Sequence, residues 1–433
     1  MNVLYIHTHD TGTYIEPYGR GMATPHLMSL AREGILFRQA YSAAPTCSPS
    51  RSALLTGMWP HVAGMLGLAH RGFSLRDPGK HLAHVLRENG METVLCGMQH
   101  ESKDRSELGY VRLLDPGRES GDFNEIDRRN AQRVAEYLSQ EKNRPFFLSF
   151  GMSNTHRPFP PAKVDPGYVG VPDSLYDSPQ NRADMAGLQT AATNADDCVG
   201  IVLDALKESG LDQETIVLFT TDHGIAFPGM KCNLYDAGIR VALILKIPGH
   251  FGGKTVSDAL VSQVDIFPTL CDLLEIEKPR WLQGISLLPL LRGQSESVRE
   301  DLFAEVTYHA AYEPMRCIRT ARYKLIRLYN GLDRAVPANM DDGPAKDFVL
   351  KHGWLDQPRA RVQLFDLYLD PLERVNLVGD RRYETVLRDL DHRLERWMRE
   401  TRDPLLDDER VPKPGGAVVN RQSCMSPNEP NFE

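Results

Sequence analysis

The chain has 433 residues, of which 41% are hydrophobic and 25% are charged, and its formal net charge is −8. That length is enough for a large buried core and predicts about three domains. The net negative charge argues against a nucleic-acid partner or an anionic membrane surface, because both bind proteins with an excess of Lys and Arg. No apolar stretch approaches the roughly 18 residues of a membrane span, so we expect no membrane partner.

The first ten residues, MNVLYIHTHD, have no basic segment ahead of an apolar run and lead directly into a strand-like pattern. We therefore expect a cytoplasmic protein, or one whose secretory signal has been removed. The seven cysteines are scattered and form no C-x-x-C pair, which disfavours a disulfide framework or a zinc cluster. Most of them are expected to be small buried side chains in a reducing compartment.

Short apolar strands alternate with helices through the first part of the chain. The first helix is predicted to begin at Thr24-Pro25, with Thr24 as its N-cap, and to end at Gly34. Further helices are predicted at 80–89, 124–142 and 182–209, and strands at 3–6, 93–96, 145–150, 215–219 and 241–245. This alternation is typical of a mostly parallel sheet with helices on both faces, an α/β fold.

The pattern changes near residue 295. Segments 303–309 and 317–329 predict antiparallel strands, segment 383–400 predicts an amphipathic helix, and the chain beyond Arg402 is rich in Pro, Gly and Asp. We therefore expect a catalytic α/β domain at 1–295 and a smaller α+β subdomain with an antiparallel sheet at 296–401. An extended tail at 402–433 is expected to wrap the surface.

Polar clusters follow four of the predicted strands. They are HD at 9–10, MQH at 98–100, NTH at 154–156 and DH at 222–223. Because the carboxyl ends of parallel strands meet at one edge of a sheet, these side chains should lie together there. The sequence therefore predicts the functional site at that edge.

One motif carries specific chemistry. The sequence CSPSR at 47–51 is followed by LTG at 55–57, which gives the pattern C-x-P-S-R-x-x-x-L-T-G. This pattern resembles the signature of the sulfatase family, in which the cysteine is oxidised to formylglycine. The resemblance covers nearly the whole chain and implies an alkaline-phosphatase-like fold. The segments GMLGL (64–68), GIAFP (224–228) and NLY (233–235) are most similar to the heparan N-sulfatase, or sulfamidase, branch.

The family chemistry gives a reason for modifying the cysteine. A thiolate that attacked sulfur would leave a stable adduct, whereas an aldehyde hydrate attacks through one hydroxyl and expels sulfate through the other. The resemblance implies that a formylglycine-generating enzyme modifies Cys47. Arg51, one helical turn later, would stabilise the deprotonated hydrate.

The resemblance also implies a divalent metal, held by Cys47 in its modified form together with Asp10, Asp222 and His223. His9 stands where the family commonly has a second aspartate, and it would either ligate the metal or orient Asp10. Ca²⁺ is the expected ion. Mg²⁺ stays open, and two imidazole ligands would move the preference towards Mn²⁺ or Zn²⁺.

Three further residues would complete the catalytic set. By resemblance His100 helps to deprotonate the hydrate, His156 protonates the leaving nitrogen or oxygen, and Lys231 binds a sulfate oxygen. Met98 stands where the family has a lysine, and Lys103 either replaces that cation or is a solvated surface residue. Candidates for the leaving-group pocket are His70, Arg71, Glu101, Asn233, Asp236, Arg240, Glu305 and His309.

Together these features predict a metal-dependent sulfatase acting on a sulfate ester or sulfamate of a sugar, with N-sulfoglucosamine as the favoured substrate. One alternative is a phosphonate monoester or phosphodiester hydrolase of the same superfamily. The other is a binding protein that has lost catalysis. The sequence leaves open whether the chain forms homo-oligomers.

Overall fold

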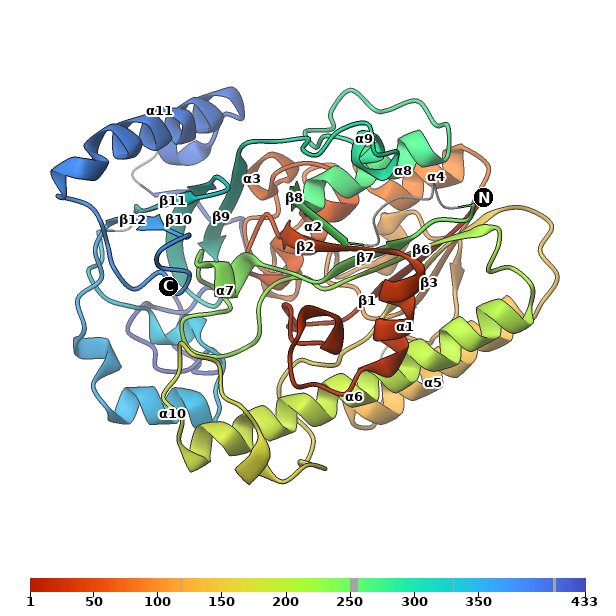
Figure 1. Ribbon diagram of the computed structural model, residues 1–433, viewed down its shortest axis with the longest axis horizontal. Helices are drawn as coiled ribbons and strands as arrows, with labels where there is room; N and C mark the ends of the chain where they lie inside the picture. The colour runs from red at the N-terminus through yellow and green to blue at the C-terminus, as the bar shows by residue number, and fades with distance from the viewer. Residues whose placement is uncertain (118, 250–255, 330, 408–409) are drawn as a thin grey trace.

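The computed structural model describes residues 1–117, 119–249, 256–329, 331–407 and 410–433. Two lobes with different sheets lie side by side (Figure 1). The larger lobe holds an eight-stranded sheet of order β4-β3-β5-β1-β6-β7-β2-β8, and the smaller lobe a four-stranded sheet of order β12-β11-β10-β9. The predicted fold class is therefore confirmed.

The large sheet is parallel except for β7, which runs antiparallel to β6 and β2. Its strands are β1 (Asn2–His7), β2 (Ile35–Tyr41), β3 (Glu92–Gly97), β4 (Arg112–Leu113), β5 (Phe146–Gly151), β6 (Thr215–Thr220), β7 (Leu243–Lys246) and β8 (Val256–Ser262). The small sheet is antiparallel and consists of β9 (Leu302–Tyr308), β10 (Tyr312–Arg319), β11 (Tyr323–Leu328) and β12 (Val362–Asp366).

Helices cover both faces of the large sheet (Figure 1). They are α1 (Pro25–Glu33), α2 (Cys47–Thr56), α3 (Pro60–Ala63), α4 (Leu82–Glu88), α5 (Phe123–Leu138), α6 (Pro179–Glu208), α7 (Asp236–Ile239), α8 (Ile266–Leu273) and α9 (Leu288–Leu291). The small lobe adds α11 (Glu384–Glu400), whereas α10 (Pro344–Lys351) lies between β11 and β12 in sequence and packs against α6 of the large lobe. No helix in the described part of the chain is both long and apolar enough to cross a membrane.

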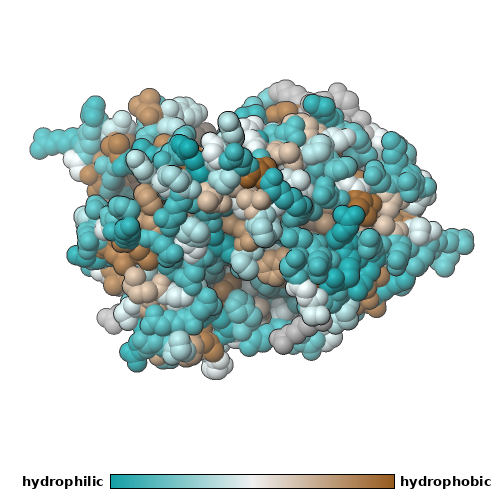
Figure 2. Space-filling view, turned by 90° about the horizontal axis from the view of Figure 1, so that it is seen from below, coloured by the Kyte–Doolittle hydropathy of each residue, from teal (hydrophilic) through white to brown (hydrophobic). Residues whose placement is uncertain are grey.

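The central strand β1 shows why the sheet is buried on both faces. Its Val3 and Tyr5 pack in the core shared with α2, α4 and α8. Its Leu4 and Ile6 pack in the core shared with α1, α5 and α6. Successive side chains of a strand point to opposite faces, so a short run of apolar residues fills both cores. The underside of Figure 1, seen in Figure 2, is mostly hydrophilic, as expected for helices that bury only one face.

Two local predictions differ from the structure. Thr24 occupies the N-cap position of α1, but its Oγ1 accepts from the backbone N–H of Glu16 instead of capping the helix. The carboxylate of Asp196 on α6 accepts from the N–H groups of His26 and Leu27 in its place. The segment predicted as strand at 317–329 contains a turn, because β10 ends at Arg319 and β11 begins at Tyr323.

Buried ion pairs join the two lobes. The guanidinium of Arg316 on β10 binds Asp403 through two hydrogen bonds, at 2.5 and 3.0 Å, and lies 3.4 Å from Glu305. Glu305 on β9 accepts from the backbone and the ring of His61 on α3 in the large lobe. A metal ion could also be held by residues of the types found here, His61, Glu305 and Asp403. The buried guanidinium of Arg316 already supplies the positive charge at this place.

A second ion cluster lies at α7. Arg319 and Lys324 of the small sheet both bind the carboxylate of Asp236, and Lys324 also binds Glu373 at 2.8 Å. This cluster ties the small sheet to the end of the loop that leads from β6. Both clusters hold charges away from water, and each charge has a partner of opposite sign.

Candidate active site

The predicted polar clusters do meet at one edge of the large sheet. His9 and Asp10 follow β1, His100 follows β3, Asn154 to His156 follow β5, and Asp222 follows β6. These four strands are neighbours in the order β3-β5-β1-β6, and all run parallel. Their carboxyl ends therefore form one continuous rim.

The cysteine motif forms a single helix, α2. Cys47 is its first residue, and Gly57, with φ of 66°, ends it in the left-handed conformation. Ser50 fixes the start of the helix to the sheet, since its Oγ donates to the backbone oxygen of Asp222 at 2.5 Å. The Cys47 side of α2 is thereby held beside the end of β6.

Cys47 is 3% exposed, and its Sγ lies 3.4 Å from Nε2 of His223. Burial raises the pKa of the Cys47 thiol well above its ordinary value. An unmodified thiol in this place is therefore a poor nucleophile. All seven cysteines lie among the described residues, and all are buried and unpaired.

Four side chains with metal-binding atoms converge next to Cys47. Nδ1 of His9 lies 2.8 Å from Oδ1 of Asp10 and 3.3 Å from Oδ2 of Asp222. Nε2 of His223 lies 3.3 and 3.7 Å from the same two oxygens. None of these four side chains has any exposed surface.

His223 tests whether a cation fits this cluster. Its Nδ1 is 2.9 Å from the carbonyl oxygen of Gly224, so Nδ1 carries the proton and donates it to that oxygen. In the neutral form of the ring, Nε2 then has only a lone pair, and this atom faces the carboxylates of Asp10 and Asp222. Lone pairs and carboxylates facing one another are unfavourable unless a cation lies between them, so the donor set fits a divalent metal.

Two cationic side chains balance the carboxylates. Nη2 of Arg51 is 3.0 Å from Oδ2 of Asp222, and Nζ of Lys231 is 2.8 Å from Oδ2 of Asp10. Burial would raise the pKa of Asp10, but Lys231 and the surrounding imidazoles outweigh it and hold that pKa well below its ordinary range. Both carboxylates are therefore ionised at neutral pH.

Three histidines of the cluster are stacked edge to face. The His9 ring lies 5.0 Å from that of His100 and 4.6 Å from that of His156, centroid to centroid. Nε2 of His9 is 3.2 Å from Nδ1 of His100, and burial lowers the pKa of His100 well below its ordinary value. His100 is therefore neutral and keeps one ring nitrogen with a lone pair. His156 is 30% exposed at its side chain, and its Nε2 lies 3.9 Å from Asp10.

The structure adds one residue that the sequence analysis did not single out. Asp341, from the small lobe, places Oδ2 2.9 Å from Nζ of Lys231. It lies in the segment between the short helix η7 (Pro337–Asn339) and α10, more than a hundred residues from Lys231 in the sequence. No motif surrounds it, so only the three-dimensional structure identifies it.

Some predicted pocket residues do lie near the catalytic cluster. The ring of His70 is 5.9 Å from that of His100, and Glu101 is buried and accepts from the backbone N–H of His100. Asn233 donates to the backbone oxygen of Lys231. The Nδ1 atom of His309 is buried without a hydrogen-bond partner in the described part of the chain. Burial lowers the pKa of its ring, and nearby Lys231 lowers it further.

Other predicted pocket residues are engaged elsewhere. Arg71 donates to Asn420 at 2.6 Å and to the carbonyl oxygen of Pro427 at 2.7 Å, so the C-terminal tail holds its guanidinium. Arg240 donates to the backbone oxygen of Arg38. Lys103, the suggested replacement for the family lysine at Met98, is exposed. Substrate contact by these residues stays a prediction.

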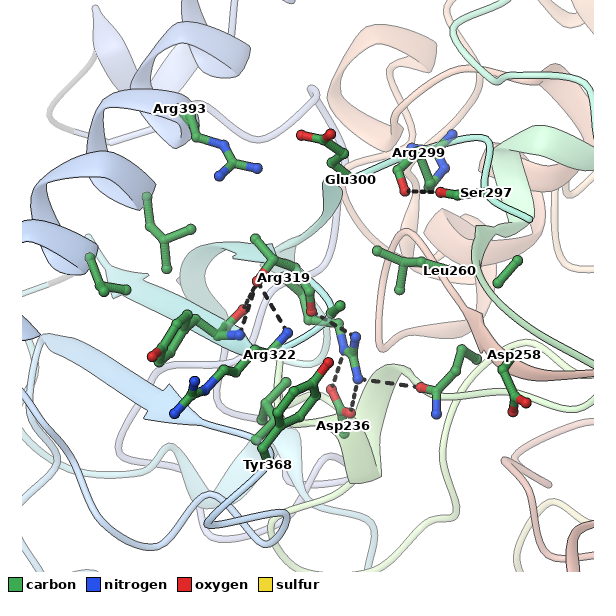
Figure 3. Close-up of a pocket in the computed structure, with 18 of the residues that line it drawn as sticks. Asp236, Asp258, Leu260, Ser297, Arg299, Glu300, Arg319, Arg322, Tyr368 and Arg393 are labelled. Atoms are coloured by element: carbon green, nitrogen blue, oxygen red, sulfur yellow. Dashed lines mark hydrogen bonds and ion pairs between the residues drawn. The ribbon is translucent and has the colours of Figure 1, made fainter. Parts of the chain in front are cut away.

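Asp236 and Arg240 line a different cavity, of about 960 Å³, between the small sheet, α11 and β8. In Figure 3 the guanidinium of Arg319 points at Asp236, which shows that this carboxylate is already paired. None of the catalytic candidates Cys47, His100, His156 and Lys231 lines this cavity. It is separate from the cluster at the sheet edge.

Comparison with known proteins identifies the class. A family model described as sulfatase matches residues 1–276, and a model described as N-sulphoglucosamine sulphohydrolase, C-terminal, matches residues 230–348. The chain belongs to the sulfatase family and is a sulfuric ester hydrolase.

One curated relative and two solved structures show how far the likeness extends. Human N-sulphoglucosamine sulphohydrolase is 31% identical over 93% of this chain and 91% of its own length. A protein solved with its substrate D-glucosamine-2-N,6-O-disulfate has a TM-score of 0.75 at 19% identity, over 94% of this chain and 99% of that one. The phosphonate monoester hydrolase of Agrobacterium radiobacter has a TM-score of 0.70 at 19% identity, over 94% and 97%. Both structural likenesses concern the fold.

Proposed function

We propose that this sulfatase removes the N-sulfate group of a glucosamine residue of a heparan-type sugar. The match to the human N-sulphoglucosamine sulphohydrolase over nearly the full length of both proteins carries this proposal. The C-terminal family model supports it independently, because it spans the segment that contains Lys231 and Asp341. The substrate named for the 19% identical structure is a glucosamine with both an N-sulfate and a 6-O-sulfate, which supports a sulfated glucosamine as the sugar.

We propose that Asp10, Asp222, His223 and His9 hold a divalent metal beside Cys47. Such an ion polarises a sulfate oxygen and lowers the charge repulsion between the sulfate and the carboxylates. Two imidazole nitrogens with two carboxylates favour Mn²⁺ or Zn²⁺ over the Ca²⁺ expected from the family. His9 can alternatively orient Asp10, to which its Nδ1 is hydrogen-bonded.

The remaining residues divide the work of binding and proton transfer. Lys231 donates to a sulfate oxygen from its place beside Asp10, and the N-terminus of α2 faces the same anion. The formylglycine derived from Cys47 supplies the nucleophile in its hydrated form. Neutral His100 accepts a proton from this group, and Nε2 of His156 gives one to the leaving nitrogen.

A phosphonate monoester hydrolase is the second candidate. The histidine at 223 and the methionine at 98, where sulfatases commonly have asparagine and lysine, favour it. The fold of the Agrobacterium phosphonate monoester hydrolase is similar, which supports this candidate. The 31% identity to the human sulfohydrolase and the match to the C-terminal family model favour the N-sulfate hydrolase more strongly.

Parallel assays separate the candidates. The purified enzyme is incubated with N-sulfoglucosamine, 4-nitrophenyl sulfate and a phosphonate monoester, and kcat/KM is measured for each. The proposal predicts turnover of the first two and release of free glucosamine from the first. Turnover of the phosphonate alone would support the second candidate, and turnover of none with formylglycine present at position 47 would favour a binding protein.

The state of residue 47 must be known for these assays. Peptide mass spectrometry of the segment CSPSR distinguishes cysteine from the lighter formylglycine. We propose that a maturation enzyme of the host performs this oxidation. Activity is then expressed per modified molecule.

A further inference from the structure

Asp341 brings a carboxylate from the small lobe into the active site. Nζ of Lys231 lies 2.8 Å from Asp10 on one side and 2.9 Å from Asp341 on the other. The lysine side chain is 3% exposed, whereas that of Asp341 is 15% exposed. Oδ2 of Asp341, the atom that faces Lys231, is buried, so the exposed part of this side chain lies away from the lysine and is the part that a substrate can reach.

The position of Asp341 does not depend on Lys231. Asn339, two residues earlier, accepts from the N–H of Ala311 and donates to Glu313. Asp342, the next residue, binds Lys346 at 2.7 Å and accepts from Ser426 in the C-terminal tail. The segment is thus fixed on both sides of Asp341, and its carboxylate is held at a defined place.

The surroundings of Asp341 are those of the leaving group. Besides Lys231 and Asp10, the groups whose charges act on it are His156 and His309. Burial would raise the pKa of Asp341, but Lys231 outweighs it and lowers the pKa to about 2. An ionised carboxylate thus lies 2.9 Å from the lysine proposed to bind sulfate, and that lysine shares the Oδ2 atom of Asp10 with His156, the residue proposed to protonate the leaving atom.

This carboxylate discriminates between two kinds of scissile bond. The bridging oxygen of a sulfate ester has lone pairs and no hydrogen, so a carboxylate beside it is repelled. The bridging nitrogen of a sulfamate carries a hydrogen that a carboxylate can accept, and hydrogen bonds to charged groups are among the stronger ones. A carboxylate at this place therefore favours nitrogen over oxygen.

We infer that Asp341 accepts a hydrogen bond from the sulfamate N–H and so gives this enzyme its preference for N-sulfate over O-sulfate. The inference rests on the proposed function. As an oxygen of the hydrated formylglycine bonds to sulfur, the S–N bond breaks, its electron pair passes to nitrogen, and His156 supplies a proton, which gives the amine. The amine takes a further proton from water at neutral pH, and the ammonium group of the product then faces Asp341.

The test compares kcat/KM on N-sulfoglucosamine with kcat/KM on 4-nitrophenyl sulfate. Asp341→Asn also disturbs Lys231, but that loss affects both substrates and cancels in the ratio. We expect the ratio to fall by about 10- to 100-fold, the range for loss of a hydrogen bond to a charged group. Asp347→Asn is the matched control, because it removes an exposed carboxylate in the first turn of α10, six residues further along the chain, and it should leave the ratio unchanged.

A second measurement uses the unaltered enzyme in case Asp341→Asn does not fold. Glucosamine, which carries the ammonium group, should inhibit at least about tenfold more strongly than glucose. An unchanged ratio in folded Asp341→Asn, or equal inhibition by the two sugars, overturns the inference while the proposed function stands. If the wild-type enzyme hydrolyses the aryl sulfate but not N-sulfoglucosamine, the proposed function fails and the inference fails with it.

Discussion

Removal of the His156 side chain should affect substrates according to how much their leaving group needs a proton. Nδ1 of His156 lies 2.5 Å from the carbonyl oxygen of Arg157 and donates to it, which leaves Nε2 as the atom for proton transfer. Nε2 faces the cluster, 3.9 Å from Asp10. A sugar amine departs poorly without a proton, whereas nitrophenolate departs readily without one.

The expected magnitude follows from the position of the ring. A positioned general acid contributes about 10²–10⁴-fold to the rate. Because 30% of the His156 side chain is exposed, water reaches the same place and can replace part of its function. We therefore expect His156→Ala to lower kcat/KM on N-sulfoglucosamine by about 10²–10³-fold, or about 3–4 kcal/mol of transition-state stabilisation. On 4-nitrophenyl sulfate the loss should stay below about tenfold.

The assay measures both substrates with wild type, His156→Ala and the control His352→Ala, which removes an exposed histidine at the end of α10. Circular dichroism and the melting temperature establish that each variant is folded. If the wild type also hydrolyses glucosamine 6-O-sulfate, His156→Ala should lower kcat/KM on it as much as on the sulfamate, because an alkoxide leaving group also needs a proton. Equal losses on the sulfamate and the aryl ester in a folded His156→Ala protein would refute the acid role.

Three further outcomes are expected. Cys47→Ala should abolish turnover at an unchanged melting temperature, and wild-type activity in that variant would exclude the formylglycine mechanism. Removal of metal by a chelator should stop turnover, and added Mn²⁺ or Zn²⁺ should restore more activity than Ca²⁺. Full activity of a preparation that elemental analysis shows to be metal-free would disprove the ligand assignment. His81 caps α4 through Nδ1, and burial lowers its pKa to about 3, so the folded state holds it neutral while the unfolded state takes up a proton below about pH 6.5. The free energy of unfolding therefore falls as the pH falls. The variant His81→Asn keeps a side-chain acceptor for the cap, and in urea unfolding its free energy should fall by about 2–3 kcal/mol less than that of the wild type between pH 7 and pH 4.5. Equal pH dependence in the two proteins would contradict this.

The sequence predicts the large sheet well because its strands are short apolar runs that are buried on both faces. The polar residues after β1, β3, β5 and β6 follow those runs directly, so their meeting at one edge follows from parallel topology alone. Strands β2, β4 and β8 escaped prediction. In β2 the burial is uneven, with Arg38 exposed and Gln39 half-buried, β4 has only two residues, and the first half of β8 is partly exposed.

The pocket residues were harder to predict because their partners come from distant parts of the chain. Asp236 follows the active-site loop in sequence, yet Arg319 and Lys324 from the small sheet bind it. Arg71 lies close to the cysteine motif, yet the tail more than 340 residues later holds it. Asp341 has no local pattern at all, and only the packing of the two lobes brings it to Lys231.

The ion network around Arg316 has a consequence for how such enzymes can be recombined. His61 belongs to the large lobe, Glu305 and Arg316 to the small sheet, and Asp403 to the segment after α11. Loss of Arg316 removes the guanidinium that the buried carboxylates of Asp403 and Glu305 share, which costs about 3–5 kcal/mol. A chimera that exchanges one lobe with that of a relative must therefore carry compatible residues at all four positions. Inheritance of the lobes as a matched pair would also keep Asp341 together with the lysine it contacts.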